Sequence, residues 1–230
     1  KDAGIQKKKN LKPNMEAQFW KIYVNVANAF GIAPAPDVYE SPFITTGMRL
    51  ANVEYNAFKI AGDMKSGRSF SELRYIISRN LFLFQCFYMA GIDMTASTLK
   101  TIILASMMYF SGRPVQDANH DAIYRALKNV PKALQIEYNR VLDGIKNKEM
   151  NVSAWLKAVD YSCDRAALLM CADFATAVNC IRNEDIHISK LTADERIAEL
   201  TKFAMSDEYF MLRTKLNILN YDNADDFLQG

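Results

Sequence analysis

Two aspartates four residues apart, Asp160 and Asp164, are the side chains whose spacing most directly suggests chemistry. Residues i and i+4 share one face of a helix, so both carboxylates would point at the same neighbour. Small or apolar residues surround the pair, including Cys163. Charge buried in such surroundings is costly unless it has a partner, such as a metal ion or a cationic side chain.

Two interpretations of this pair are open. In the first, the acids lie on the solvated side of an amphipathic helix and pair with Arg165 or Lys157, which is a common arrangement. In the second, they face a pocket between helices. The order of the surrounding elements and the motifs described next favour the pocket.

Residues 71–83 follow an amphipathic helical pattern that places Asn80 on or beside a buried stripe. Together with residues 160–167, this segment resembles the active site of the CaaX-prenyl-endopeptidase and HtpX-like zinc metallopeptidases. Glu72-Leu73 matches the start of that family's D-E-L-x-x-x-x-A-H-E-x-x-H helix, and residues 160–167 match its E-x-x-x-D-R-A-G helix. The resemblance runs in segments over residues 36–172.

The positions that carry the chemistry in that family are changed in this chain. The resemblance puts Arg79, Asn80 and Leu83 where the first zinc-binding histidine, the catalytic glutamate and the second histidine stand. An arginine keeps its proton, an asparagine cannot act as a general base, and a leucine has no donor atom. In the family, the residue at the Asp160 position binds zinc and the one at the Asp164 position orients the first histidine. We therefore predict no zinc and no peptidase activity at this site.

A guanidinium is a suitable replacement for a metal between two carboxylates, because it stays charged and donates paired hydrogen bonds. We predict that Arg79 pairs with Asp164, Asp160 or both, and so clamps two helices together. Arg79, Asn80, Leu83, Asp160 and Asp164 would then form a structural remnant of the pocket.

Periodicity and capping signals predict the elements that position these residues. Ser69 with Glu72, and Thr192 with Glu195, form capping-box patterns, and Thr95 is expected to cap a further helix. The fold class is α+β and mostly helical, with a small N-terminal sheet followed by a helical bundle; the resemblance implies a zincin-like, minigluzincin-type architecture. It also implies that the strand at 57–61 is an exposed sheet edge beside the helix that begins at Ser71. Strands are expected at 38–39, 48–53 and 57–61, and helices at 15–30, 71–89, 95–110, 121–128, 131–146, 153–182, 192–205 and 206–219.

Length and composition limit the classes of protein to which this chain can belong. A chain of 230 residues, half of them hydrophobic, suits one substantial core, so we expect a basic flexible tail at 1–13 and a single domain over 14–230. A net charge of +2 gives no strong field for nucleic acid, and no run of about 18 apolar residues predicts a membrane span. The tail is rich in lysine: Lys1, Lys7, Lys8, Lys9 and Lys12.

Cysteine and histidine usage indicates no cofactor or metal. The cysteines lie in apolar stretches without a C-x-x-C pair, which indicates reduced, buried thiols: Cys86, Cys163, Cys171 and Cys180. Neither His120 nor His187 has a second ligand at helical spacing. Reduced cysteines and the lack of a signal-peptide pattern favour the cytoplasm.

The leading hypothesis is a non-enzymatic interaction or assembly domain with a protein partner, built on a degenerate zinc-protease fold. Non-catalytic relatives of this kind occur as domains of larger bacterial proteins, and the lack of an initial Met suggests a piece of a longer chain. One alternative is a hydrolase with a site rebuilt around Asp160, Cys163 and Asp164. A weaker one is an adaptor that binds nucleic acid or a membrane surface through the lysine tail.

Overall fold

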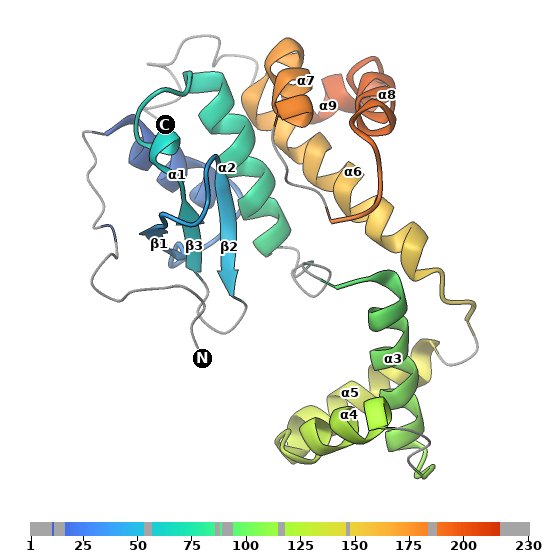
Figure 1. The fold of residues 1–230 in the computed structure, drawn as a ribbon. Helices are drawn as coiled ribbons and strands as arrows, with labels where there is room; N and C mark the ends of the chain where they lie inside the picture. The colour runs from blue at the N-terminus through green and yellow to red at the C-terminus, as the bar shows by residue number, and fades with distance from the viewer. Residues whose placement is uncertain are drawn as a thin grey trace. The chain divides into compact units, whose positions relative to one another are not determined.

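The structure is a computed structural model, and Figure 1 shows its fold. It describes residues 11, 17–52, 57–85, 88, 94–114, 118–145, 148–183 and 188–216. The chain divides into two compact units, the first made of residues 1–90 and 157–230 and the second of residues 91–156. The architecture is α+β and mostly helical with one small sheet, as predicted. Over the described residues, no helix is both long enough and apolar enough to cross a membrane.

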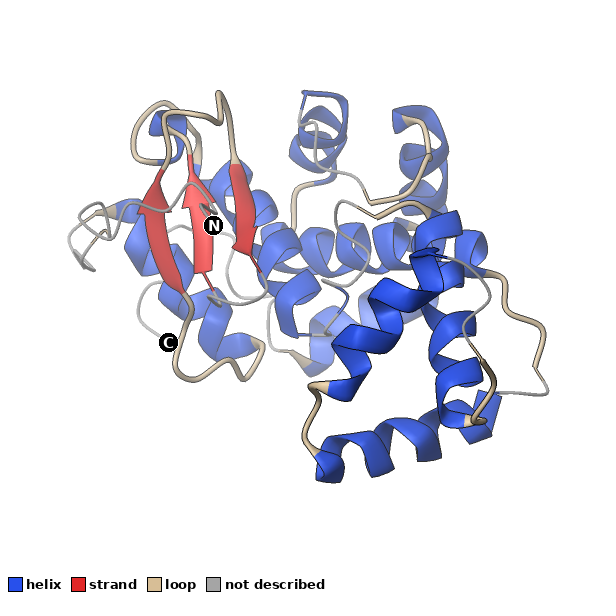
Figure 2. Ribbon diagram, turned by 60° about the horizontal axis from the view of Figure 1, so that its bottom comes forward, coloured by secondary structure: helices blue, strands red, loops and turns tan. Residues whose placement is uncertain are grey.

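The first unit contains a three-stranded sheet, drawn in red in Figure 2. Its strands lie close to the predicted ranges: β1 (Asp37–Glu40), β2 (Met48–Asn52) and β3 (Ala57–Ile60). The spatial order is β1-β3-β2, with β3 parallel to β1 and antiparallel to β2. Val38 and Leu50 both lie opposite Phe58, so these three side chains share one face of the sheet.

The prediction that residues 57–61 form an exposed edge is wrong, because β3 is the middle strand. Neighbouring side chains of a strand point to opposite faces, and Ala57 and Phe58 are both buried. Both faces of β3 are therefore covered, as suits a central strand. A central strand pairs its backbone N–H and C=O groups with a strand on each side. An edge strand leaves these groups unpaired along one side.

Two helices pack on the face of the sheet that carries Phe58. From α1 (Gln18–Ala29), the Tyr23 ring lies 6.5 Å from the Phe58 ring, measured between centroids. From α2 (Phe70–Gln85), the Phe84 ring lies 5.9 Å from it. The sheet therefore serves as the support that fixes where α2 lies.

The start of α2 is tied to the start of β2. The predicted capping box is present: Ser69 Oγ accepts from the Glu72 backbone N–H at 3.2 Å, and the Glu72 carboxylate accepts from the Ser69 N–H at 2.8 Å. Just before it, Arg68 donates to the Asp63 carboxylate from Nε at 2.9 Å and from Nη2 at 2.7 Å. The same carboxylate accepts from the Gly47 N–H at 3.1 Å, so local signals and one ion pair set the beginning of this helix.

The prediction of one helix over residues 153–182 is wrong. The structure has α6 (Val152–Cys171) and α7 (Phe174–Asn183), separated by Ala172 in the left-handed region at φ 58°. Asp173 Oδ1 accepts from the Thr176 N–H at 3.0 Å and so caps α7. An aspartate that bonds its local backbone competes with continuation of a helix, which explains the break.

The last two helices of the first unit begin where predicted. Thr192 and Glu195 form the expected capping box for α8 (Ala193–Ala204). Ser206 Oγ caps α9 (Asp207–Lys215). The core of this unit draws on α1, the sheet, α2, α6, α7, α8 and α9: its centre includes Ile22, Tyr23, Phe58, Ile77, Leu81, Leu168, Ile181 and Leu200.

The described residues of the second unit contain α3 (Ala96–Phe110), α4 (Ala118–Lys128), α5 (Lys132–Ile145) and the first turn of α6. Thr95 caps α3 as predicted. The Tyr124 ring of α4 lies 5.2 Å from the Tyr109 ring of α3, and its hydroxyl donates to the Arg113 carbonyl at 3.0 Å. These helices bury aromatic surface against each other.

The prediction of a single domain over residues 14–230 stays a prediction. Within the second unit, aromatic rings of α4 and α5 lie against rings of α3. Some other predictions concern residues outside the described ones, namely the lysines of the tail, Cys86, His187 and the helix ends at 86–87, 89 and 217–219. From the tail, only Leu11 is described, and its N–H donates to the Val38 carbonyl at 2.9 Å.

Candidate functional site: a buried arginine–aspartate cluster

Within the first unit, α2 and α6 bring Arg79, Asp160 and Asp164 together, and the predicted bridge is confirmed. Arg79 Nη2 donates to Asp160 Oδ1 at 2.6 Å, and Nε donates to Asp164 Oδ1 at 2.9 Å. The Arg79 side chain is 2% exposed and those of the two aspartates 0% and 2%. Over the described residues, Arg79 Nη1 has no hydrogen-bond partner, so two of the three guanidinium nitrogens are used.

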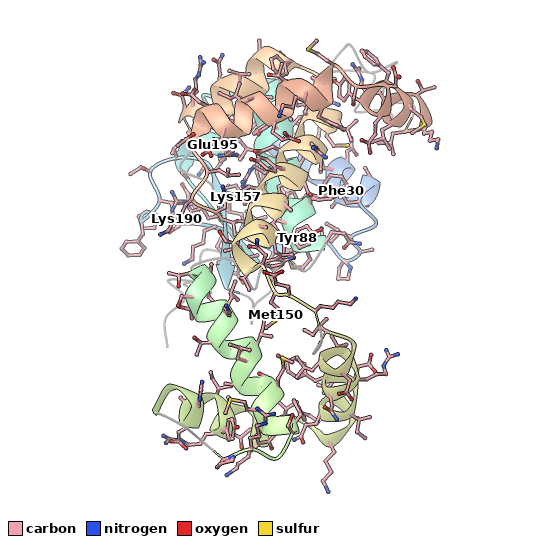
Figure 3. The ribbon with its side chains drawn as sticks, turned by 90° about the vertical axis from the view of Figure 1, so that its right-hand side faces the viewer. Phe30, Tyr88, Met150, Lys157, Lys190 and Glu195 are labelled. Atoms are coloured by element: carbon pink, nitrogen blue, oxygen red, sulfur yellow. The ribbon has the colours of Figure 1, made fainter. Side chains whose placement is uncertain are left out.

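Asp160 also anchors the chain that leads into α8. Its carboxylate accepts from the backbone N–H of Ile188 at 3.0 Å and of Ser189 at 2.7 Å, and from Ser189 Oγ at 2.6 Å. In Figure 3, where Lys190 and Glu195 are labelled, this segment runs alongside α6. A carboxylate that accepts this many hydrogen bonds has little capacity left for another ligand.

Asp164 is shared between two arginines. Arg196 of α8 donates to Asp164 Oδ2 from Nε at 2.8 Å and to Oδ1 from Nη2 at 2.6 Å. The Tyr75 hydroxyl donates to Oδ1 at 3.0 Å. With Arg79 and Asp160, the cluster holds two positive and two negative side chains, so its formal charge is balanced. Opposite charges in contact are the condition under which burial of such groups can be tolerated.

Neighbouring groups shift the pKa values of side chains in this cluster. Burial by itself would raise the pKa of Asp164, but the charges of Arg79 and Arg196 and their hydrogen bonds outweigh it, so the pKa lies below its ordinary value. Burial would lower the pKa of Arg79, and the charges of Asp164 and Asp160 raise it above the usual range instead. Burial and the Asp164 charge raise the pKa of Tyr75, so its hydroxyl stays protonated and donates. Asp164 and Arg79 therefore stay charged, and Tyr75 stays protonated, near neutral pH.

The remaining residues predicted for the pocket are buried near the cluster. Asn80 is buried, and its Nδ2 donates to the Ile76 carbonyl of its own helix at 2.9 Å. Leu83 is buried in the apolar packing of α2. Cys163 is 0% exposed. These placements agree with the predicted buried stripe and give none of the three a route to a solvent-borne substrate.

The interpretation of Asp160 and Asp164 as solvated acids paired with Arg165 or Lys157 is wrong. Arg165 instead pairs with Glu199 of α8, from Nη2 to Oε1 at 2.5 Å. Along this stretch, α6 therefore carries the buried acids Asp160 and Asp164 beside Arg165, which belongs to a partly exposed pair.

Sequence reasoning missed three members of the cluster: Tyr75, Ser189 and Arg196. Tyr75 precedes Arg79 by four residues, so the helical spacing could have placed both on one face. Ser189 and Arg196 lie about 30 residues beyond the aspartates, and nothing local marks them as partners. Only the packing of α8 against α6 brings them close.

The donor set does not fit a zinc ion. Zinc needs several nitrogen, sulfur or carboxylate ligands that point at one centre, whereas a guanidinium already lies against both carboxylates here. Nor do the described residues contain a group of three or more His, Cys, Asp or Glu side chains that could hold a metal ion. The chain matches no family model, and no curated protein and no solved structure matches it.

Proposed function

We propose that this protein is a non-enzymatic interaction or assembly protein built on a degenerate zinc-protease fold, related to the CaaX-prenyl-endopeptidase and HtpX-like metallopeptidases. In this proposal, Arg79 replaces the first zinc-binding histidine, and the former catalytic centre is a structural clamp between α2, α6 and α8. The function is to bind a protein partner, and the clamp stabilises the fold that presents the binding surface.

The observation that carries the proposal is the saturation of both aspartates. Asp160 accepts from Arg79 and from the Ile188–Ser189 backbone, and Asp164 accepts from two arginines and a tyrosine. A general base needs a lone pair that can take a proton, and a metal ligand needs one that can face the ion. Neither carboxylate has that freedom while the arginines are in place.

The same observation weighs against a hydrolase rebuilt around Asp160, Cys163 and Asp164. The thiol has no exposed surface, and the flanking acids are neutralised by arginine rather than by a histidine that could activate a nucleophile. The order of elements supports the proposed relationship, because a small sheet precedes α2, and α6 follows with the second motif.

Metal content and peptidase activity test the first part of the proposal. After purification in a zinc-containing buffer, we expect elemental analysis to give well under one equivalent of zinc, and casein to stay uncleaved. About one equivalent of zinc that is lost in Asp160→Ala, and kept in the surface variant Asp121→Ala, would overturn the pseudoenzyme proposal.

A reconstruction variant tests the proposed ancestry separately. Arg79→His, Asn80→Glu and Leu83→His together restore the motif on α2, with the two histidines four residues apart on one helix face. We expect the triple variant to bind about one equivalent of zinc and to lose it when Asp160→Ala is added. A folded triple variant that binds no zinc would reject descent from this metal site, whatever the peptidase assay of the original chain shows.

A further inference from the structure

The second unit carries an apolar stripe along α5 that its own helices leave exposed. Leu134 is 59% exposed, Tyr138 40% and Val141 54%. Positions i, i+4 and i+7 fall on one face of a helix, so the three side chains line up along α5. A stripe of this spacing is the pattern by which one helix packs on another.

The face that α5 turns to its own unit is a different one. Leu142 is buried, and Gln135 Nε2 donates to the carbonyls of Leu127 and Val130 at 3.2 and 2.7 Å. Leu142 and Gln135 lie about 80–100° around the helix from Leu134, at 100° per residue. The stripe is therefore a second apolar face of α5, beside the one that packs within the unit.

At one edge, α3 extends the stripe. The Phe110 ring lies 5.6 Å from the Tyr138 ring, and Phe110 is itself only half-buried. The three α5 side chains expose on the order of 300 Å², against roughly 800 Å² per partner in a standard interface. Such an area suits the apolar centre of an interface whose rim is polar.

The charges that flank the stripe suit a second copy of the same helix. Glu137 and Arg140 form an exposed ion pair, with side chains 57% and 76% exposed, on one side of the stripe. If two α5 helices pack antiparallel about a two-fold axis near Tyr138, Leu134 of each copy lies against Val141 of the other. Glu137 of each copy then lies within about one helical turn of Arg140 of the other, so the ion pairs can form between chains. Antiparallel packing also places the helix dipoles favourably.

We propose that Leu134, Tyr138 and Val141 form the centre of a homodimer interface in which α5 packs antiparallel on α5 of a second copy. This inference goes beyond the function proposed for the buried cluster and does not depend on it, because it rests on the second unit alone. An interface of this size is expected to dissociate on dilution through the micromolar range.

Sedimentation equilibrium of the full 230-residue chain over a range of concentrations tests the proposal. We expect a reversible monomer–dimer equilibrium, which Leu134→Glu and Val141→Glu each weaken at least tenfold. Ile136→Glu is the matched control: Ile136 is 73% exposed, on the opposite side of the same helix, and this variant should dimerise like the original chain. Circular dichroism confirms that each variant keeps its helices.

Disulfide trapping tests whether the two α5 helices pack antiparallel. When Leu134→Cys and Val141→Cys chains are mixed, we expect the antiparallel arrangement to crosslink the two different chains far faster than either variant crosslinks with itself. A chain that stays monomeric at all concentrations would overturn the proposal. So would a dimer that Val141→Glu leaves unchanged, or one that Ile136→Glu disrupts as strongly.

Discussion

The two units of the chain use the same charged side chains in opposite ways. In the first unit, the Arg79 and Asp160 side chains are 2% and 0% exposed, and two helices depend on their contact. In the second, Arg125 and Asp121 form an i, i+4 ion pair along the surface of α4, with side chains 72% and 44% exposed. Water competes with an exposed ion pair, so the pair contributes little to stability. Loss of one partner of a buried pair leaves the other charge buried without a partner, which is costly.

The two units also differ in how completely they bury their apolar side chains. The first unit buries Ile76, Ile77 and Leu81 of α2 almost completely in a core shared by six helices and the sheet. In the second unit, α5 buries Leu142 but leaves Leu134 and Val141 exposed. We therefore expect the first unit to contribute most of the free energy of unfolding. The apolar surface that we propose for dimerisation lies on the second unit.

The largest expected effect comes from breaking the buried cluster. Arg79→Ala leaves the buried Asp160 carboxylate without its arginine and Asp164 with Arg196 alone, so we expect it to reduce the free energy of unfolding by about 3–5 kcal/mol. Urea denaturation followed by the fluorescence of Trp20, in a Trp155→Phe background that removes the other tryptophan, measures the change. An unchanged denaturation midpoint would show that the cluster does not hold α2 to α6.

Acid should weaken the first unit through the same cluster. The pKa of Asp164 is lower in the folded state than in the unfolded chain, so its stabilisation is fully present above the unfolded value near 4 and is lost as the pH falls through the folded value. Between the unfolded and the folded value, protonation of this one group weakens the folding equilibrium constant by at most about tenfold per pH unit. Denaturation of the original chain and of Asp164→Asn at several pH values separates this contribution from that of other acids. Equal acid sensitivity in both proteins would contradict the assignment.

A smaller effect is expected where Asp160 holds the chain that enters α8. Ser189→Ala removes the hydroxyl that donates to Asp160, and hydrogen bonds to charged groups contribute about 1.5–3 kcal/mol. We expect a loss of stability in this range by urea denaturation. Ser162→Ala is the matched control on α6, because that hydroxyl donates only to the Ala158 carbonyl of its own helix. Similar losses in both variants would mean that the anchor has no special role.

The smallest effect is expected in the second unit. Arg125→Ala removes an exposed ion pair within one helix, so the free energy of unfolding should change by about 0.5 kcal/mol or less. Far-UV circular dichroism during urea denaturation, which follows the helices of the whole chain, measures the change. A loss comparable with that of Arg79→Ala would remove the contrast between the two units.

Local signals allowed much of the fold to be predicted from the sequence. The Ser69–Glu72 and Thr192–Glu195 capping boxes and the Thr95 cap act within one helical turn, so the residues that decide a helix start are neighbours in the sequence. One such signal was overlooked: Asp173 caps α7 in the same way, and the helix expected across it is interrupted.

The Arg79 bridge was also predictable, but for a different reason. Asp160 and Asp164 share a helix face, and two acids among apolar residues need a cation. The resemblance to a zinc-protease motif indicated where that cation lies. The prediction that this protein lacks peptidase activity stays a prediction until metal content and activity are measured.

What the sequence by itself determined is the local structure, namely where helices and strands begin and which side chains share a face. Tertiary structure alone decided that β3 is the central strand, that Ser189 and Arg196 complete the cluster, and that the chain forms two units. Each of these depends on contacts between residues far apart in the chain. Such contacts are selected by the total burial of apolar surface and the pairing of buried polar groups, and no local pattern encodes either.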